Sequence, residues 1–371
     1  MRRHPTILIS CGEVSGDMHA ANLVLELLKR FPNARILALG GEHIAKVGGE
    51  LLYHIEDYAI IGFSGVVTKL PRLMRLEWTL KKVLANGVDL FIPVDYPGLN
   101  LRLAAHAKKH GVPVLYYISP QVWAWGGGRV EKLARVVDRM AVILPFEEGF
   151  FRGHGIPAEF VGHPLVEDHH IPPPVEQGER VGVGLLPGSR TSEVRRILPI
   201  FLKTAEQIQT RDGNIRFTIG RSRFVPKRIY KKIVSRHSVD ADVDGVTKDV
   251  MAKSRLLLVA SGTATLQGAL FETPLIISYR LSALNYMIAR RLVKVSNIGL
   301  VNIILGEEVC PEFVQAEAQP KDIATAAVRL LESQTDRQDM VAAFKKLRGM
   351  LVGSGGSRRV AEISEQIING T

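Results

Sequence analysis

The chain alternates short apolar, β-branched runs with longer amphipathic runs, and it does so in two successive blocks. In the first block, the segments between the strand-like runs have the periodicity of amphipathic helices. Pro71 suits the first position of one of these helices. Apolar strands joined by helices predict a parallel sheet covered on both faces. The expected strands of this block are residues 6–11, 35–39, 89–94, 113–118, 140–144 and 158–161, and the expected helices are 18–31, 71–84, 99–110 and 129–136.

A proline-rich break at residues 166–178 separates the blocks, because its run of three prolines continues neither a helix nor a central strand. The alternation then restarts. Expected strands lie near 180–185, 215–219, 239–243, 255–260 and 274–278, and late helices near 320–333, 336–350 and 358–368.

We therefore predict an α/β chain of two doubly wound domains facing a cleft. The domains are residues 1–166 and 180–350, with a linker at 167–179 and a C-terminal helix in 351–371 that packs back on the first domain. Ligands of such sheets bind at the carboxyl ends of the strands, so the cleft is the expected site.

Charge and cysteine usage narrow the class of protein. Residues 1–170 carry 19 Lys and Arg against 17 Asp and Glu, and residues 171–371 carry 29 against 20, so anions should favour the second half. The basic pairs are scattered, and without a nucleic-acid signature we expect no nucleic-acid partner. Cys11 and Cys310 are the only cysteines, which excludes a disulfide framework and is typical of a reducing cytosol.

No membrane-spanning segment is expected, because no run approaches ~18 consecutive apolar residues. The apolar run after His4 is also too short for a signal peptide. Residues 60–84 mix apolar residues with cations that include Lys69, Arg72 and Arg75. A helix packed on the core is the default interpretation, and a face that rests on anionic lipid is the alternative.

Two glycine-rich loops in the second half each follow an apolar strand and precede a helix. They are Pro187-Gly188-Ser189-Arg190 and Ser261-Gly262-Thr263-Ala264-Thr265. Such loops direct free backbone N–H groups and the positive end of a helix dipole at one point, which suits phosphate. Together they predict a diphosphate site in which Arg190 pairs with the anion.

Gly12-Glu13-Val14-Ser15-Gly16-Asp17 follows the first strand. It is either a tight turn with Asp17 as a helix N-cap or a loop that presents Glu13 and Ser15 to substrate, and the two are compatible.

Asp95 follows the strand at 89–94, where apolar surroundings would raise its pKa. It is therefore a candidate general base, and the alternative is that it caps the helix at 99–110. The loop 119–125 holds Trp123 and Trp125, which either wedge the structure or stack on sugars and cover acyl chains.

The aspartate run at 239–245 superficially matches a calcium loop or the paired carboxylates of a metal-dependent transferase. The twelfth position of the calcium pattern is Met251 rather than Glu, so the bidentate ligand is absent. The run is better interpreted as a strand with Val239, Ala241 and Val243 inward and the aspartates outward. We expect no metal.

Together these residues resemble the lipid-A-disaccharide synthases, glycosyltransferases of the GT-B fold, nearly end to end. The matching motifs are Gly12 to Asp17, Asp95-Tyr96-Pro97, Asn100, Ser119 to Trp125 with Gln121, Val161-Gly162-His163-Pro164, Leu186 to Arg190 with Glu193, Ala260 to Thr265, Tyr279-Arg280, Ala289 to Lys294 and Leu300-Val301-Asn302.

The resemblance implies that a UDP-activated 2,3-diacylglucosamine is joined to the 6-hydroxyl of 2,3-diacylglucosamine 1-phosphate with inversion, releasing UDP and needing no cofactor. It implies that the partners are an acylated donor and an acylated acceptor, and it leaves homo-oligomerisation open. It also implies that the protein is cytoplasmic and lies on the inner face of the inner membrane. The implied catalytic residues are Asp95 and Glu13. The implied substrate contacts are Ser15, Asp17, Asn100, Gln121, Trp123 and Trp125, and the implied UDP contacts are Gly188, Ser189, Arg190, Ser261, Gly262, Thr263, Thr265, Gln267, Tyr279 and Asn302.

Two positions depart from the family pattern. Gln267 stands where related enzymes often have a Glu that holds the ribose hydroxyls, and Gly98 stands where some members have Asp. Three other classes stay open on the residues alone. They are a sugar-nucleotide epimerase of the same fold, an NADP oxidoreductase in which Arg221 reads the 2′-phosphate, and a non-catalytic basic protein that binds a membrane surface through residues 60–84.

Overall fold

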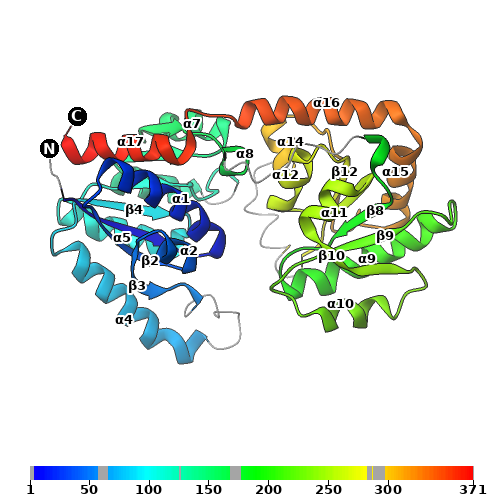
Figure 1. Cartoon of the computed structure of the whole chain (residues 1–371), viewed down its shortest axis with the longest axis horizontal. Coiled ribbons are helices and arrows are strands. Elements are labelled where there is room, and N and C mark those ends of the chain that lie inside the picture. The colour runs from blue at the N-terminus through cyan, green and yellow to red at the C-terminus, as the bar shows by residue number, and fades with distance from the viewer. Residues whose placement is uncertain are drawn as a thin grey trace. The chain divides into compact units, whose positions relative to one another are not determined.

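The computed structural model describes residues 4–56, 66–124, 127–167, 177–281, 286 and 297–370. The chain divides into two compact units (Figure 1). Unit 1 comprises Met1–Glu167 and Leu351–Thr371, and unit 2 comprises Asp168–Met350. Among the described residues, no helix combines the length and the apolar character needed to cross a bilayer.

Unit 1 is built on a seven-stranded parallel sheet of order β3-β2-β1-β4-β5-β6-β7. The six expected strands are present, and β3 is an additional edge strand that its polar ends concealed. The strands are β1 (Thr6–Cys11), β2 (Arg35–Gly40), β3 (Glu50–His54), β4 (Leu90–Val94), β5 (Leu115–Tyr117), β6 (Arg139–Val142) and β7 (Ala158–Phe160).

Helices cover both faces of this sheet, as the continuous apolar strands require. Leu8 of β1 belongs to one buried cluster, whereas its neighbours Ile7 and Ile9 belong to the cluster on the opposite face. The helices of unit 1 are α1 (Val14–Arg30), α2 (Glu42–Lys46), α4 (Val66–Leu84), α5 (Pro97–Lys109), α6 (Gly127–Val136), α7 (Pro145–Gly153), α8 (Pro164–Glu167) and α17 (Gly356–Asn369).

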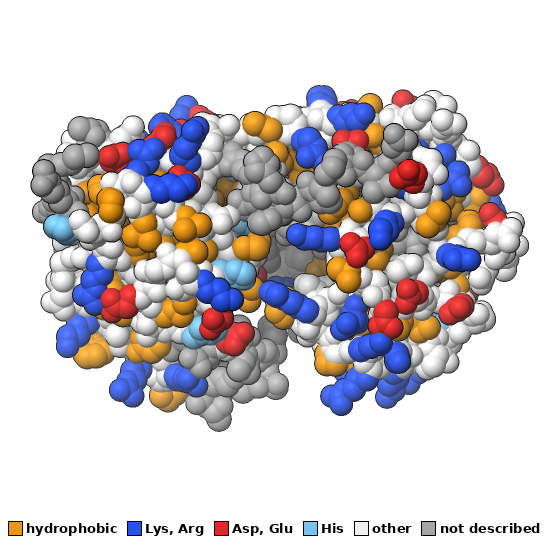
Figure 2. Space-filling model, viewed as in Figure 1, with side chains coloured by type: hydrophobic (Ala, Val, Ile, Leu, Met, Phe, Trp, Pro, Cys, Tyr) orange, Lys and Arg blue, Asp and Glu red, His pale blue; other side chains and the backbone are white. Residues whose placement is uncertain are grey.

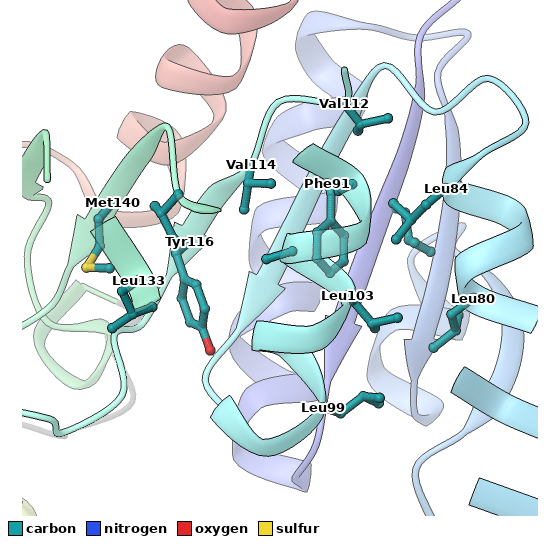
Figure 3. Packing of buried hydrophobic residues seen from close by; sticks show 14 of the residues in the cluster. Leu80, Leu84, Phe91, Leu99, Leu103, Val112, Val114, Tyr116, Leu133 and Met140 are labelled. Atoms are coloured by element: carbon teal, nitrogen blue, oxygen red, sulfur yellow. The ribbon is translucent and has the colours of Figure 1, made fainter. Parts of the chain in front are cut away.

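The core beneath α4 and α5 is shown in Figure 3. Phe91 of β4 packs among Leu80 and Leu84 of α4 and Leu103 of α5, and all four are buried. Pro71 lies inside α4 rather than at its first position, so that expectation is wrong. Because proline has no N–H, α4 lacks one hydrogen bond near its N-terminus, and the apolar face beyond Pro71 holds the helix in place.

The C-terminal helix α17 completes unit 1 (Figure 1). It lies beside α1, and Arg30 of α1 binds Glu362 at 2.8 Å and Glu365 at 2.7 Å. Val360 and Ile363 are buried in the cluster that also holds the apolar face of α1. Main-chain bonds from His163 N to the Leu351 carbonyl (2.9 Å) and from Gly356 N to the Val161 carbonyl (2.8 Å) fix the returning chain.

Unit 2 has a six-stranded parallel sheet of order β10-β9-β8-β11-β12-β13. Its strands are β8 (Val183–Leu186), β9 (Phe217–Arg221), β10 (Ala241–Val246), β11 (Leu256–Ala260), β12 (Leu275–Tyr279) and β13 (Glu312–Val314). Its helices are α9 (Thr191–Gln209), α10 (Lys227–Val234), α11 (Thr247–Lys253), α12 (Thr263–Leu270), α14 (Leu300–Leu305), α15 (Pro320–Glu332) and α16 (Gln334–Leu351), preceded by a 3-10 turn at Gln177–Glu179.

The aspartate run forms strand β10 as expected. Val239 and Ala241 are buried and Val243 is half-buried, whereas Asp240, Asp242 and Asp244 are exposed. Asp244 pairs with Lys227 of α10, and no cluster of three or more His, Cys, Asp or Glu side chains suited to a metal ion lies within the described ranges. Figure 2 shows Lys and Arg side chains dispersed over the face in view, between acidic and apolar ones.

Candidate functional site

The chain leaves β4 through two consecutive residues in the left-handed region, Asp95 (φ 47°) and Tyr96 (φ 49°). Non-glycine residues reach this region only when their surroundings compensate for the strain, and such residues gather at functional sites. Asp95 N donates to the carbonyls of Tyr117 (3.2 Å) and Ile118 (3.1 Å). The Asp95 carbonyl in turn accepts from Asn100 Nδ2 and the Tyr116 hydroxyl, each at 2.7 Å. Asp95 is thus held from both sides.

Asn100 connects the ends of β1 and β4. Its Nδ2 also donates to the Ser10 carbonyl at 3.1 Å, and its Oδ1 accepts from Ser10 Oγ at 2.7 Å. We expected Asn100 to contact substrate. Its side chain is fully buried, and it instead positions Asp95. Helix α5 has Tyr96 as its N-cap residue, without a side-chain capping bond, so the interpretation of Asp95 as that cap is wrong.

The Asp95 carboxyl has the chemistry of a base. Burial raises its pKa to about 6, and the nearby Glu13 carboxylate adds to the rise against a hydrogen bond from the Tyr96 backbone. A carboxylate with a pKa near the working pH accepts a proton efficiently and is still ionised at neutrality. Glu13, the N-cap residue of α1, and Ser15 in its first turn are both exposed.

Asp17 has a different role from either of the two expected ones. Helix α1 begins at Val14 with Glu13 as its N-cap, so Asp17 lies inside the helix. Its buried carboxylate accepts from Gly41 N at 2.6 Å and His43 N at 3.0 Å, which caps the neighbouring helix α2. The substrate contact expected of Asp17 is therefore corrected to a structural one.

Gly12 is required by the packing of this loop. A Cβ at Gly12 would lie 2.0 Å from Tyr96 Cγ, so only glycine lets the tyrosine ring rest against the end of β1. The end of β1 and the loop of Asp95 are therefore in direct contact, which is the juxtaposition expected of neighbouring parallel strands.

Glu147, which sequence reasoning missed, anchors the tryptophan loop. Its Oε1 accepts from Ser119 Oγ at 2.6 Å and from Trp123 Nε1 at 2.9 Å, and its Oε2 accepts from Leu144 N at 3.1 Å. Trp123 also packs edge-on against Phe146, with ring centroids 4.9 Å apart. Burial raises the pKa of Glu147 to about 7, because its hydrogen bonds only partly offset the loss of solvent.

The contacts of the tryptophan loop support the structural interpretation of Trp123. Trp123 is held as a structural wedge, and Gln121 two residues earlier is exposed. Trp125 lies outside the described residues.

In unit 2, Glu193 occupies the N-terminus of α9. Its Oε2 accepts from Ser189 N at 3.0 Å and Arg190 N at 3.2 Å. The expectation that these two N–H groups are free is wrong, because a glutamate three residues into the helix folds back onto them. Gly188 (φ 108°) permits this arrangement, since a Cβ there would lie 2.5 Å from Glu193 Oε2. The Arg190 side chain is 69% exposed and lies 3.7 Å from Glu193 Oε1.

The second glycine-rich loop keeps two donors available. Thr265 N and Oγ1 both donate to the Gly262 carbonyl, at 3.0 and 2.8 Å, and Ser261 Oγ donates to the Ile298 carbonyl at 2.8 Å. The N–H groups of Thr263 and Ala264, in the first turn of α12, find no acceptor among the described residues. This loop has the geometry expected of an anion site.

Two further residues expected at the nucleotide site differ in their surroundings. Tyr279 at the end of β12 is half-buried, and burial together with Glu193 raises its pKa against Arg190 and Arg196, which places it near the start of α9. Gln267 is also half-buried, on α12.

Asn302 does not have the free groups that a nucleotide contact requires. Its Oδ1 accepts from Val309 N and Cys310 N, and its Nδ2 donates to the Cys310 carbonyl and to Glu312. These four bonds use every donor and acceptor of the fully buried amide, so its expected role is corrected to holding the loop before β13. The expected motif at residues 289–294 lies outside the described residues.

The fold has solved counterparts that cover nearly the whole chain. They include CalG4, the calicheamicin glycosyltransferase, with a TM-score of 0.62 and 15% identity over 100% of this chain and 99% of that one. They also include a UDP-GlcNAc 2-epimerase from Neisseria meningitidis bound to UDP-GlcNAc, with a TM-score of 0.65 and 11% identity over 99% and 100%. The expected GT-B fold is confirmed, and at these identities the likeness concerns the fold alone.

Sequence similarity separates the enzyme classes that share this fold. A family model described as lipid-A-disaccharide synthetase matches residues 7–359. The chain is 39% identical to the lipid-A-disaccharide synthase of Syntrophus aciditrophicus over 373 residues, covering 98% of this chain and 97% of the relative. It is 38% identical to that of Nitrosococcus oceani over 378 residues, covering 99% and 97%. The chain therefore belongs to the lipid-A-disaccharide synthase family and makes the lipid A disaccharide by glycosyl transfer.

Proposed function

We propose that the protein joins UDP-2,3-diacylglucosamine to 2,3-diacylglucosamine 1-phosphate in a single inverting displacement with Asp95 as the general base. The observation that carries this proposal is the state of Asp95: a strained loop at the end of β4 held by Asn100 and Tyr116, with a pKa of about 6. Asp95 takes the proton of the acceptor 6-hydroxyl. The oxygen of that hydroxyl bonds to the anomeric carbon of the donor, and the bond between this carbon and the UDP oxygen breaks.

Charge that develops on the leaving UDP is stabilised by unit 2 in this proposal. The N–H groups of Thr263 and Ala264 and the start of α12 face the β-phosphate, and the exposed Arg190 guanidinium pairs with the diphosphate. The α9 loop contributes Arg190 and not its N–H groups, because Glu193 already accepts those.

We further propose that the protein lies on an anionic membrane through α4, since both substrates are acylated. Met74 and Trp78 on this helix are 65% and 63% exposed, and Lys82 lies 5.5 Å from the Trp78 ring. Apolar side chains flanked by cations are the pattern that binds anionic lipid surfaces.

The direct test is turnover with purified protein in uncharged detergent micelles. Incubation with both acylated substrates should release UDP and form one β-1,6-linked disaccharide 1-phosphate, and excess chelator should leave the rate unchanged. Release of UDP from the donor without disaccharide, or epimerisation of the donor sugar, would contradict the proposal. Loss of activity on chelation that Mg²⁺ restores would contradict the metal-free mechanism.

A further inference from the structure

A groove of about 430 Å³ lies between α5 and α6 of unit 1, and its lining begins at Pro97, the first residue of α5. Its floor is apolar, formed by Pro97, Leu101 and Ala105 of α5 and Val136 of α6. Pro97 follows Asp95 by two residues, so the groove begins close along the chain to the proposed base.

The walls of this groove carry an unbalanced positive charge. Arg129, Lys132 and Arg135 recur every three residues along α6, so they share one face, and all three are exposed. No acidic partner for any of them occurs in the part of the chain that the structure describes. Like charges at this spacing repel one another, so the arrangement favours an anionic occupant.

The opposite wall is fixed by Arg102 of α5. Its Nε donates to Glu77 at 2.9 Å, and its Nη1 donates to the Gly98 carbonyl at 2.6 Å. Glu77 also pairs with Lys81 at 2.7 Å, so this single carboxylate is shared between two cations. The groove therefore carries Arg102 on the α5 side and Arg129, Lys132 and Arg135 on the α6 side.

We propose that this groove binds the phosphate and the adjoining acyl methylenes of the acceptor, a phosphorylated acylated sugar. The inference rests on the proposed function and assigns the acceptor a place that the catalytic loop alone does not provide. Arginine guanidinium groups recognise phosphate through charge-assisted hydrogen bonds, and the apolar floor removes methylene groups from water. A free phosphate would leave the floor unused and a neutral lipid would leave the cations unpaired, so an anionic amphiphile fits both parts.

The test is the triple variant Arg129→Gln, Lys132→Gln, Arg135→Gln, assayed in uncharged micelles. Its KM for the phosphorylated acceptor should rise about tenfold or more, because each lost charge-assisted bond carries up to that factor. The KM for the donor, the affinity for UDP and the melting temperature should stay unchanged. With an acceptor that lacks the phosphate, wild type and variant should have the same KM.

The matched control removes three exposed cations of unit 1 outside the groove, Lys29→Gln, Lys46→Gln and Lys109→Gln. An equal rise of the acceptor KM in the control, or none in the groove variant, overturns the assignment. So does a groove variant that loses only its binding to phosphatidylglycerol vesicles while its acceptor KM in micelles is kept, since the occupant is then a membrane lipid.

Failure of the proposed function would be visible separately, as absence of disaccharide with the wild-type protein. Equilibrium binding of the phosphorylated acceptor to wild type and to the groove variant then still decides the groove. Equal affinities would contradict the assignment, and a loss of about tenfold or more confined to the phosphorylated compound would support it.

Discussion

Replacing Asp95 by Asn removes a base and keeps the shape of the side chain. Asn tolerates the left-handed backbone at φ 47°, so the loop should be retained. We expect turnover to fall by roughly 10²–10⁴, with UDP affinity and melting temperature preserved. In the wild type, kcat/KM should fall as the pH drops through about 6, because the carboxylate then gains a proton. A variant with near-normal turnover would place the base elsewhere, and Glu13 would be the next candidate.

The pKa of Glu147 predicts a pH-dependent stability of unit 1. The folded value of about 7 exceeds the ordinary 4.5, so the folded state holds this proton more tightly than the unfolded state does. Stability is therefore lost as the pH rises from about 4.5 through 7, by about 3 kcal/mol. The free energy of unfolding of the wild type minus that of Glu147→Gln should fall by this amount between pH 4.5 and 8.

Urea unfolding followed by tryptophan fluorescence measures this difference, because all three tryptophans, Trp78, Trp123 and Trp125, belong to unit 1. Glu148→Gln removes the same charge from the next residue of α7. If that control shows the same pH slope, net charge rather than burial of Glu147 explains the effect.

The position of Asp95 at the end of a buried strand could be predicted from the sequence, because it is a local property. Glu147 could not, since its partners Ser119 and Trp123 lie 28 and 24 residues away and meet it only when β5 and β6 pair. The available signal was local: Leu144-Pro145 followed by Glu at the third helical position is a helix start. Glu193 is also at the third position of its helix. Its carboxylate accepts from N–H groups of the first glycine-rich loop, so that loop is partly occupied by its own helix cap.

At the scale of elements, α4 carries the prediction about membranes. Met74→Ser with Trp78→Ser should abolish most binding to anionic vesicles while leaving UDP affinity unchanged, because both side chains already face solvent. Sedimentation with phosphatidylglycerol vesicles measures this binding. Leu25→Ser on α1, which is 45% exposed, is the matched control. Undiminished vesicle binding in the α4 variant would move the membrane contact to another element.

Elements with strong apolar runs were predictable, whereas two of the edge strands were not. The central strands β1, β4, β8 and β11 are predominantly apolar runs and appear close to their expected bounds. Strands β3 and β13 lie at the sheet edges, and their residues are only partly buried, so their composition resembles that of loops. These two strands form because β3 pairs with β2 and β13 pairs with β12, and a local sequence pattern does not indicate such pairing.

For the whole molecule, the dependence of unit 1 on α17 can be tested by mutation. Ile363→Ala removes a buried side chain at the α1 interface and should cost about 2–5 kcal/mol of unit 1 stability. The tryptophan fluorescence transition should shift to lower urea, and UDP affinity in unit 2 should be retained. Gln366→Ala, on the same helix and half-buried, is the milder comparison. An unchanged fluorescence transition would mean that α17 does not stabilise unit 1.

The return of α17 to unit 1 also sets the order in which the chain can mature during synthesis. Residues 1–167 emerge from the ribosome first, yet the buried side chains that close the α1 face come from residues 356–369. Domains ordinarily fold in the order in which they emerge. Here the intervening unit, 168–350, is synthesised before α17, and the first half of the chain keeps part of its apolar surface uncovered until residues 356–369 have been synthesised. A nascent chain stalled after Met350 should accordingly bind holdase chaperones through unit 1.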